Sequence, residues 1–329
     1  MRTMIPTTRR AALGAAAAGL VPSFLARPAL AQGAARTVRI VVPFVPGGNT
    51  DLVARTIAER LGPVLRTTVV VENRSGAGGA VGVEAVAHAA PDGTTLLFHT
   101  AAVAIEPSLR RDLNYDARRD LAPVTQIAET PFLFMVSNPT PARDVAELIA
   151  HARAHPGAVN YGTAGTGSSG HLALADFAVR AGVQMTHVPY RGAAPYLLAL
   201  QTNEVQLVMD PASTAKPLAE AGRIRGLATS TAGRAPAWPE LPTVSESGLP
   251  GYAVNIWHGI FAPGGTPAPI VGRLNAALRE AMAAEGMRGW ADGLGFRIVT
   301  SAPDAFAGFF LEQVDHWATV VRRTGVRLE

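Results

Sequence analysis

Residues 42–61 read "VPFVPGGNTDLVARTIAERL" and contain the change from strand to helix that decides the fold. A run of strand-forming residues ends at a proline, and the pair Gly47-Gly48 follows. Asn49 can cap a helix, and apolar residues then recur at helical spacing. Glycines permit a tight turn and leave backbone N–H groups bare, and such groups at a helix N-terminus bind anions. The stretch therefore predicts a βα unit, and its glycines serve either a tight turn alone or an anion site at that turn.

Short apolar strands alternate with helical patterns along the rest of the chain. This alternation predicts an α/β fold with mostly parallel sheets flanked by helices. The strands are expected at 38–44, 68–73, 94–100, 131–138, 158–164, 185–190, 205–210, 223–230, 252–263 and 296–300. Helices are expected after the first glycine pair and at 79–90, 144–154, 268–285 and 302–323, with further helices following the strands between 158 and 210.

Two long apolar runs, 124–138 and 252–263, lie where the chain would pass between two series of strands. No flexible linker accompanies them, and a double crossing of this kind is typical of a hinged binding protein with its ligand in the cleft between two lobes. We therefore expect residues 32–129 plus 250–329 to form lobe 1 and residues 130–249 to form lobe 2. A single large doubly wound sheet is the alternative.

The first 31 residues have the pattern of an export signal. Arg9-Arg10 precedes the apolar run "AALGAAAAGLVPSFL", and Ala29-x-Ala31 suits cleavage after Ala31. The twin arginine fits the Tat route, although a Sec signal can also contain two arginines. No later stretch is apolar over the roughly 18 residues that span a bilayer. The sequence therefore predicts a periplasmic protein.

Charge and cysteine content exclude several classes of function. The segment 1–31 contains four arginines and no acid, so its removal brings the formal net charge from +4 to 0. A neutral mature chain has no electrostatic reason to bind nucleic acid or a membrane surface. The chain contains no cysteine, which excludes disulfides, thiol nucleophiles and zinc–thiolate sites.

The glycine-rich and serine-rich loops follow the expected strands. Because ligands of open α/β sheets gather at the carboxyl ends of the strands, these loops form the expected binding region. Several of them lead directly into helices and can direct N–H groups and hydroxyls at an anion. A small organic acid is the expected ligand. The loops are "PGGN" at 46–49, "RSGAGG" at 74–79, "TAGTGSSGH" at 163–171, "HVPYRG" at 187–192 and "MDPAST" at 209–214.

Nucleotide binding is a weaker interpretation of these loops. Residues 165–170 match G-x-G-x-x-G, but the next strand ends in "HVPY", with no acidic residue to bind a ribose. The spacing from Gly162 to Gly167 is that of a phosphate loop, yet Ser168 stands where lysine is required. We expect no cofactor.

Metal binding and hydrolysis are also weaker interpretations. His151 and His155 have the spacing of two metal ligands on a helix, but no Glu follows His151 and the surrounding face is polar. Ser168 or Ser169 could pair with a histidine in a hydrolase, but no G-x-S-x-G motif frames either serine. We expect no metal and no catalytic residue, and an exported hydrolase that uses the Ser/His loops is the alternative function.

Strings of residues along nearly the whole mature chain resemble one family. They are "VPFVPGGNTDLVAR", "VVVENRSGAGGAVGVEAVAHAAPDGTTLL", "NYGTAGTGSSGHLALADF", "HVPYRGAAPYLLAL", "VQLVMD", "IRGLATSTAGRAPAWPELPTVSESGLPGY" and "WHGIFAPGGTPAPIVGRLNAAL". These strings resemble the Bug family, the TctC-like extracytoplasmic solute receptors of tripartite tricarboxylate transporters. The resemblance implies a periplasmic binding protein of the type II fold, with two lobes that close over a small carboxylate and no catalysis.

The resemblance also implies which residues bind the ligand. In the family, the loops that correspond to 44–51 and 163–169 hold one ligand carboxylate from opposite lobes, largely through backbone N–H groups and water. Arg191 would supply a cation to a second carboxylate or else lie on the surface, and Asp210 would accept a hydrogen bond from a ligand amine or hydroxyl. Asp51 would order its loop more than touch the anion. The expected ligand-binding residues are Phe44, Val45, Gly47, Gly48, Asp51, Thr163, Gly165, Thr166, Ser168, Ser169, Tyr190, Arg191 and Asp210.

The resemblance suggests partners as well. The implied ligands are dicarboxylates, tricarboxylates, acidic amino acids and aromatic acids. Permease subunits of a tripartite transporter, or a sensor, would receive the loaded form of a monomeric receptor. We expect neither nucleic acid nor a metal among the partners.

Overall fold

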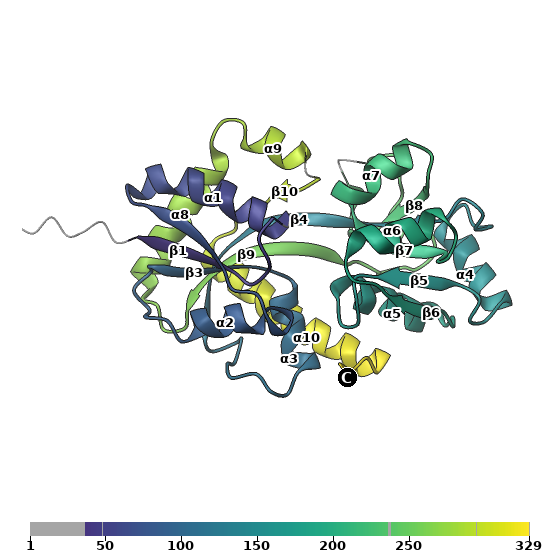
Figure 1. Ribbon diagram of the computed structural model, residues 1–329, viewed down its shortest axis with the longest axis horizontal. Helices are drawn as coiled ribbons and strands as arrows, with labels where there is room; N and C mark the ends of the chain where they lie inside the picture. The colour runs from purple at the N-terminus through teal and green to yellow at the C-terminus, as the bar shows by residue number, and fades with distance from the viewer. Residues whose placement is uncertain (1–36, 48, 236–237, 294, 329) are drawn as a thin grey trace, which may run out of the picture. The chain divides into compact units, whose positions relative to one another are not determined.

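The computed structural model, drawn as a ribbon in Figure 1, describes four ranges of the chain: 37–47, 49–235, 238–293 and 295–328. The predicted export signal, its cleavage site and the predicted ligand residue Gly48 lie outside these ranges. In the part of the chain that is described, no helix combines the length and the apolar character that a membrane crossing requires.

One group of strands, the lobe 1 sheet, is built around three parallel strands. β1 (Val38–Val42) lies between β2 (Val69–Asn73) and β3 (Thr95–Thr100) and is parallel to both. β9 (Asn255–Pro263) is antiparallel to β3. β4 (Leu121–Val136) is antiparallel to β9 and also pairs with the short β10 (Arg297–Ile298). Parallel strands place their carboxyl ends at one edge of the sheet, so the loops after β1, β2 and β3 lie together there.

The other group, the lobe 2 sheet, has the same character. β5 (Asn160–Thr163) is parallel to β6 (Thr186–Pro189) on one side and to β7 (Leu207–Pro211) on the other. β7 and β8 (Arg225–Thr229) both pair antiparallel with the end of β4. The loops after β5, β6 and β7 therefore share an edge as well.

β4 joins the two sheets, and its pairing partners change at one point. Residues up to Pro131 pair with β9, whereas Phe132 and the residues after it pair with β7 and β8. The return passage lies nearby, because the N–H of Val254 donates to the carbonyl oxygen of Ser230 over 2.8 Å. Both passages lie within or beside the long runs at 124–138 and 252–263, which explains why the crossing segments are apolar.

Helices cover the sheets. In sequence order they are α1 (Asn49–Leu65), η1 (Ala77–Gly79), α2 (Ala80–Ala87), α3 (Ala102–Leu109), α4 (Val145–Ala154), α5 (Ser169–Ala181), α6 (Ala193–Gln201), α7 (Ala212–Glu220), α8 (Ala268–Ala283), α9 (Met287–Gly293) and α10 (Pro303–Thr324). Alternate residues of β1 face different cores. Ile40 packs with residues of α1 and α8, whereas Val41 packs with residues of α2, α3 and α10. This is the arrangement expected of a strand that is buried on both faces.

Aromatic residues fill the core beside β9. Trp257 is completely buried and lies edge-on to Phe306, Phe309 and Phe310 of α10. Its indole N–H donates to Gln313 Oε1 over 3.2 Å. This tryptophan is therefore part of the hydrophobic core.

Candidate functional site

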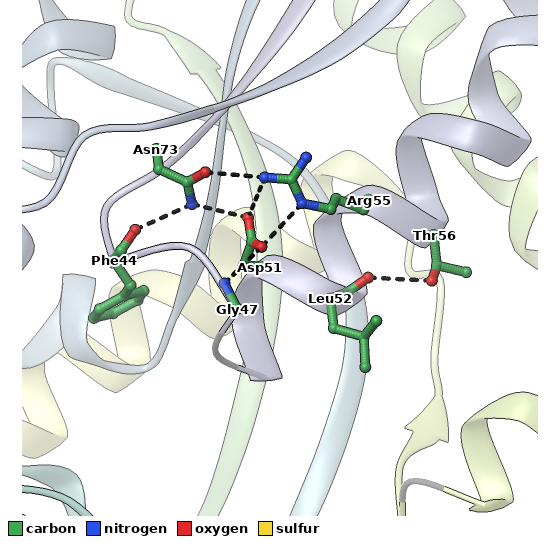
Figure 2. A network of polar contacts seen from close by, with 7 residues as sticks. All are labelled: Phe44, Gly47, Asp51, Leu52, Arg55, Thr56 and Asn73. Carbon is green, nitrogen blue, oxygen red and sulfur yellow. Dashed lines mark hydrogen bonds and ion pairs between the residues drawn. The ribbon is translucent and has the colours of Figure 1, made fainter.

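The loop between β1 and α1 is organised by Asp51, which is 3% exposed. Figure 2 shows its carboxylate surrounded by donors. One oxygen accepts from the Gly47 N–H and from Arg55 Nε, both over 2.9 Å. The other oxygen accepts from Arg55 Nη2 over 3.0 Å and from Asn73 Nδ2 over 2.9 Å. The same amide of Asn73 donates to the Phe44 carbonyl oxygen, so Asp51 and Asn73 together fix the path of the loop.

The electrostatics of this network favour an ionised Asp51. The hydrogen bonds from the Arg55 guanidinium, followed by those from the Gly47 N–H and from Asn73, lower the pKa of Asp51 to about 2 although burial opposes the shift. Because four donors already surround the carboxylate, Asp51 acts on its own loop in this structure. Its predicted contact with a ligand stays a prediction.

The loop needs glycine at position 47 for its backbone conformation. Gly47 has φ +84°, in the left-handed region, and no atom lies within 4 Å of the place where its Cβ would be. The N–H of Gly47 points inward to Asp51 and is not available to a ligand. Val45, two residues earlier, is 64% exposed, which is unusual for a large apolar side chain and suits a residue that faces a binding region.

The loop between β5 and α5 carries the second set of predicted ligand residues. Ser168 is the N-cap of α5, and its hydroxyl accepts from the His171 N–H over 3.3 Å. The Thr163 hydroxyl accepts from the Gly165 N–H over 3.2 Å. Gly165 has φ +126° and Gly167 has φ +80°, conformations that residues with a Cβ rarely adopt. The turn therefore depends on both glycines.

This loop presents donors without partners at the start of α5. No described residue accepts a hydrogen bond from the N–H groups of Thr166, Ser169 or Gly170, and none pairs with the hydroxyls of Thr166 or Ser169. α5 has 13 residues, so its N-terminus carries the partial positive charge of a full helix. Unpaired N–H groups at such a position form a site for an anion.

Two histidine side chains hold the β5–α5 loop in place. The rings of His171 and His187 stack with centroids 3.7 Å apart and an interplanar angle of 9°. His171 Nδ1 accepts from the Gly167 N–H over 3.1 Å, and His187 Nε2 lies 2.7 Å from the Thr163 hydroxyl oxygen. Burial, together with the neighbouring ring of His187, lowers the pKa of His171 to about 4, and burial also lowers the pKa of His187. The His171 ring is therefore neutral near pH 7, as its accepting Nδ1 requires.

The remaining predicted ligand residues lie on the next two loops of lobe 2. The Tyr190 hydroxyl donates to Glu204 Oε1 over 2.8 Å, and its N–H donates to the Thr163 carbonyl oxygen over 2.9 Å. Arg191 is exposed and has no ion pair or hydrogen bond with a described residue. It is free to meet a ligand or to lie on the surface, so both predicted roles stay open.

Asp210 lies at the end of β7 and is completely buried. The hydroxyls of Tyr196 and Thr214 donate to its two carboxylate oxygens. Burial raises its pKa to about 6 against the effect of these two donors. Its contact with a ligand amine or hydroxyl stays a prediction, because both oxygens already have partners within the protein.

The structure brings the predicted residues together in two groups. Phe44, Gly47 and Asp51 share the network of the β1–α1 loop, while Thr163, Gly165 and Ser168 share the β5–α5 loop. No hydrogen bond between described residues joins the two loops. Two leucine side chains lie close to the β5–α5 loop. A Cβ on Gly167 would lie 2.9 Å from Leu109 and 2.8 Å from Leu328.

Sequence reasoning missed several residues of the site. Arg55 and Asn73 hold Asp51, and Arg55 could have been found from its i,i+4 spacing to that acid. The structural role of His171 and His187 had no sequence signal, because their stacking depends on the parallel pairing of β5 with β6 and on the position of α5. Among the described residues, no group of three or more His, Asp or Glu side chains is placed to hold a metal ion.

Comparisons with known proteins identify the family and agree with the fold. The profile described as "Tripartite tricarboxylate transporter family receptor" matches residues 53–326. Protein BugT of Bordetella pertussis is 35% identical, over 90% of this chain and 91% of its own. Among solved structures, Rpa4515 of R. palustris with adipate is 36% identical with a TM-score of 0.77, covering 89% of this chain and 98% of that one. MatC of Rhodopseudomonas palustris with bound malate is 36% identical with a TM-score of 0.73, covering 87% and 99%.

The related proteins are solute receptors and not enzymes, and a further match, BugD, is a periplasmic binding protein. The profile covers most of the chain, and the matched structures share the α/β architecture described above. The chain belongs to the TctC family of tripartite tricarboxylate transporter receptors.

Proposed function

We propose that the protein is a periplasmic receptor that captures a small dicarboxylate by closure of its two lobes. The observation that carries this proposal is the group of unpaired donors at the start of α5, formed by the N–H groups of Thr166, Ser169 and Gly170 and two hydroxyls. One carboxylate would lie on these donors, and the β1–α1 loop would meet it from lobe 1.

The energies are adequate for a useful affinity. A charge-assisted hydrogen bond contributes about 1.5–3 kcal/mol, and a partly buried helix N-terminus contributes up to about 2 kcal/mol. Micromolar binding requires about 8 kcal/mol. Three or four such contacts to one carboxylate reach this range before the cost of closure is subtracted.

A dicarboxylate is favoured over a monocarboxylate by two observations. The related receptors named above were solved with adipate and malate, each of which has two carboxylates. In addition, Arg191 lies two residues beyond the end of β6 with no partner among the described residues, and an arginine can bind a second carboxylate through two parallel hydrogen bonds. The export signal with cleavage after Ala31, the monomeric state and delivery to tripartite permease subunits or a sensor belong to the same proposal.

A panel of acids tests the ligand class. Melting temperatures would be measured for the mature chain with monocarboxylates, dicarboxylates, tricarboxylates and aromatic acids. A ligand present at about a hundredfold over its dissociation constant adds roughly 2.7 kcal/mol of stability, which is a shift of several degrees. We expect dicarboxylates to give the largest shift, and a panel without any shift would contradict the proposal.

Calorimetry on variants tests the location of the site. Thr166→Val and Ser169→Ala remove the two unpaired hydroxyls and should each weaken binding of the best acid by about tenfold, since each removes a hydrogen bond to a charged group. Thr202→Val is a matched control, because Thr202 is exposed at the far end of α6. Unchanged affinity in both site variants would contradict the assignment to the α5 N-terminus.

A further inference from the structure

Two buried polar side chains, His99 and Glu106, lie at the carboxyl end of β3 and outside the site described above. His99 is 0% exposed on β3, and Glu106 is 6% exposed on α3. The Thr100 N–H donates to His99 Nδ1 over 2.8 Å, so the hydrogen of the neutral ring is on Nε2. Tyr115 donates its hydroxyl hydrogen to Glu106 Oε2 over 2.9 Å. One polar atom of each side chain therefore already has a partner.

The other polar atom of each side chain has none. His99 Nε2 and Glu106 Oε1 are buried without a hydrogen-bond partner among the described residues. Both atoms face the same point of the glycine-rich loop at 74–79. A Cβ on Gly79 would lie 3.1 Å from His99 Nε2 and 3.2 Å from Glu106 Oε1. A Cβ on Gly78 would lie 3.4 Å from the same carboxyl oxygen. Glycine at these positions keeps a polar space open around an acid that has no countercharge.

This polar space adjoins the β1–α1 loop, which is proposed to meet the ligand. The ring of Phe44 packs edge-on against His99, with centroids 5.3 Å apart. Phe44 in turn accepts a hydrogen bond from Asn73, which holds Asp51. On the other side, Arg110 Nη1 donates to the Ala77 carbonyl oxygen over 3.2 Å. Glu106 is thus linked through His99 to Phe44, a predicted ligand residue on the loop that is proposed to meet the anion from lobe 1.

The charge of Glu106 is poorly compensated. Burial raises its pKa to about 7, against a lowering by the Tyr115 hydroxyl and, more weakly, by Arg110. Arg110 itself is engaged with Asp112 over 3.0 Å. Of the neighbouring elements, α2 contributes Glu84, which acts on Tyr115, and β3 and β9 contribute the neutral imidazoles of His99 and His258. None of the described charged groups of α10 contributes to the shift, although this helix packs against α3.

We propose that Glu106 binds a proton that accompanies capture of the anionic solute. With Glu106 neutral, the lobe 1 edge accepts an anion; with Glu106 ionised, its negative charge repels the anion. A bound anion therefore favours uptake of one proton from solvent at Glu106 Oε1. This inference rests on the proposed function, because it needs an anionic solute at this edge.

The direction of the pH effect follows from linkage. Below pH 7 Glu106 is neutral in the free protein, and affinity is independent of its titration. Above pH 7 the free protein loses the proton, and bound solute raises the pKa of Glu106 and restores part of that protonation, so affinity falls as pH rises. At an effective dielectric constant of about 20, like charges must lie within roughly 12 Å of one another to change affinity by tenfold. Among the other buried groups, His99 and His258 have pKa values of about 3 and 4, and Asp210 has one of about 6, all below this window.

Calorimetry of the mature protein tests the inference, with adipate and malate as probes. Titrations at about pH 6.5 and about pH 8.5, in buffers of different ionisation enthalpy, give both the affinity and the number of protons taken up. We expect affinity to fall by about tenfold at the higher pH, with fractional proton uptake that is largest near pH 7.5, between the free and bound pKa values. Glu106→Gln should bind with the same affinity at both pH values and without proton uptake. Glu312→Gln, a change at an exposed acid on α10, should keep the behaviour of the wild type.

The outcomes separate the two proposals. Binding that is equally tight at both pH values in the wild type, or a pH effect that persists in Glu106→Gln, would overturn the role of Glu106 and leave the receptor function intact. If neither acid, nor any other acid of the panel, binds at either pH, both the proposed function and this inference fail. A melting curve of each variant without ligand confirms that it is folded.

Discussion

Asp51→Asn is the substitution whose effect the structure defines best. The change removes the negative charge and turns one acceptor oxygen into an NH2 group. Whichever way the amide is oriented, that group faces donors: the Gly47 N–H and Arg55 Nε on one side, or Arg55 Nη2 and Asn73 Nδ2 on the other. The loop then loses both its charge-assisted hydrogen bonds and part of its hydrogen-bond geometry (Figure 2).

The cost can be derived from the pKa of Asp51. A fall from 3.8 to about 2 corresponds to roughly 2.4 kcal/mol at about 1.36 kcal/mol per unit. The Arg55 side chain is 52% exposed and regains water when its partner is lost, so we expect a net loss of about 2 kcal/mol. The pKa is lowered in the folded state, so this stabilisation is complete above the unfolded value and disappears as pH falls through the folded one. It should be about half as large near pH 3.

Urea unfolding at several pH values measures this loss. Asp51→Asn should be destabilised by about 2 kcal/mol at pH 7, with the difference from the wild type shrinking towards pH 3. Asp304→Asn is the matched control, because Asp304 also lies in the first turn of a helix but is exposed, and we expect a change within about 0.5 kcal/mol. A loss below about 0.5 kcal/mol in Asp51→Asn, or a loss that does not depend on pH, would refute the reasoning.

Three further predictions concern stability. The free energy of unfolding of Glu106→Gln, relative to that of the wild type, should rise by about 3 kcal/mol between pH 4.5 and pH 8. The reason is that the raised pKa of Glu106 makes the wild type lose stability as pH rises through 7. Equal urea midpoints of the two proteins across this range would contradict the prediction. Gly259→Ala should cost roughly 3 kcal/mol, since a Cβ there would lie 2.2 Å from Phe306 Cζ; thermal melting checks this, and Phe306→Leu should restore part of the loss. Tyr196→Phe should cost about 1–3 kcal/mol in urea unfolding at pH 7, because it removes a donor to buried Asp210, and a neutral result would show that Asp210 does not need that donor.

Much of the fold could be predicted because its strands are short apolar runs that end in glycine-rich turns. Most strands lie within the expected ranges, namely β1, β2, β3, β5, β6, β8, β9 and β10, and β7 extends one residue beyond its own, to Pro211. α3 was missed: it contains Pro107, carries buried Glu106 and lacks a polar face, so its sequence has no helical periodicity. The first part of β4, from Leu121, was not predicted as a strand. The sequence indicated only a crossing run from residue 124, because Pro123 and Gln126 break the pattern of apolar residues.

The site was predictable to a smaller extent. The two loops and their glycines follow from strand-to-helix transitions, which are local features. The donors to Asp51 could not be predicted fully, because Asn73 reaches it from the neighbouring strand β2. The His171–His187 stack joins α5 to β6, and His99 and Glu106 reach the same glycine from β3 and α3, so the packing of these elements decides both arrangements.

A crystal structure of the mature protein with adipate tests the central claim most directly. The account predicts that one carboxylate lies at the start of α5, with its oxygens about 2.7–3.1 Å from the N–H groups of Ser169 and Gly170 and with the β1–α1 loop on its other side. A second carboxylate at Arg191 would support the dicarboxylate proposal. Adipate bound elsewhere, with the α5 N–H groups still unpaired, would contradict the account.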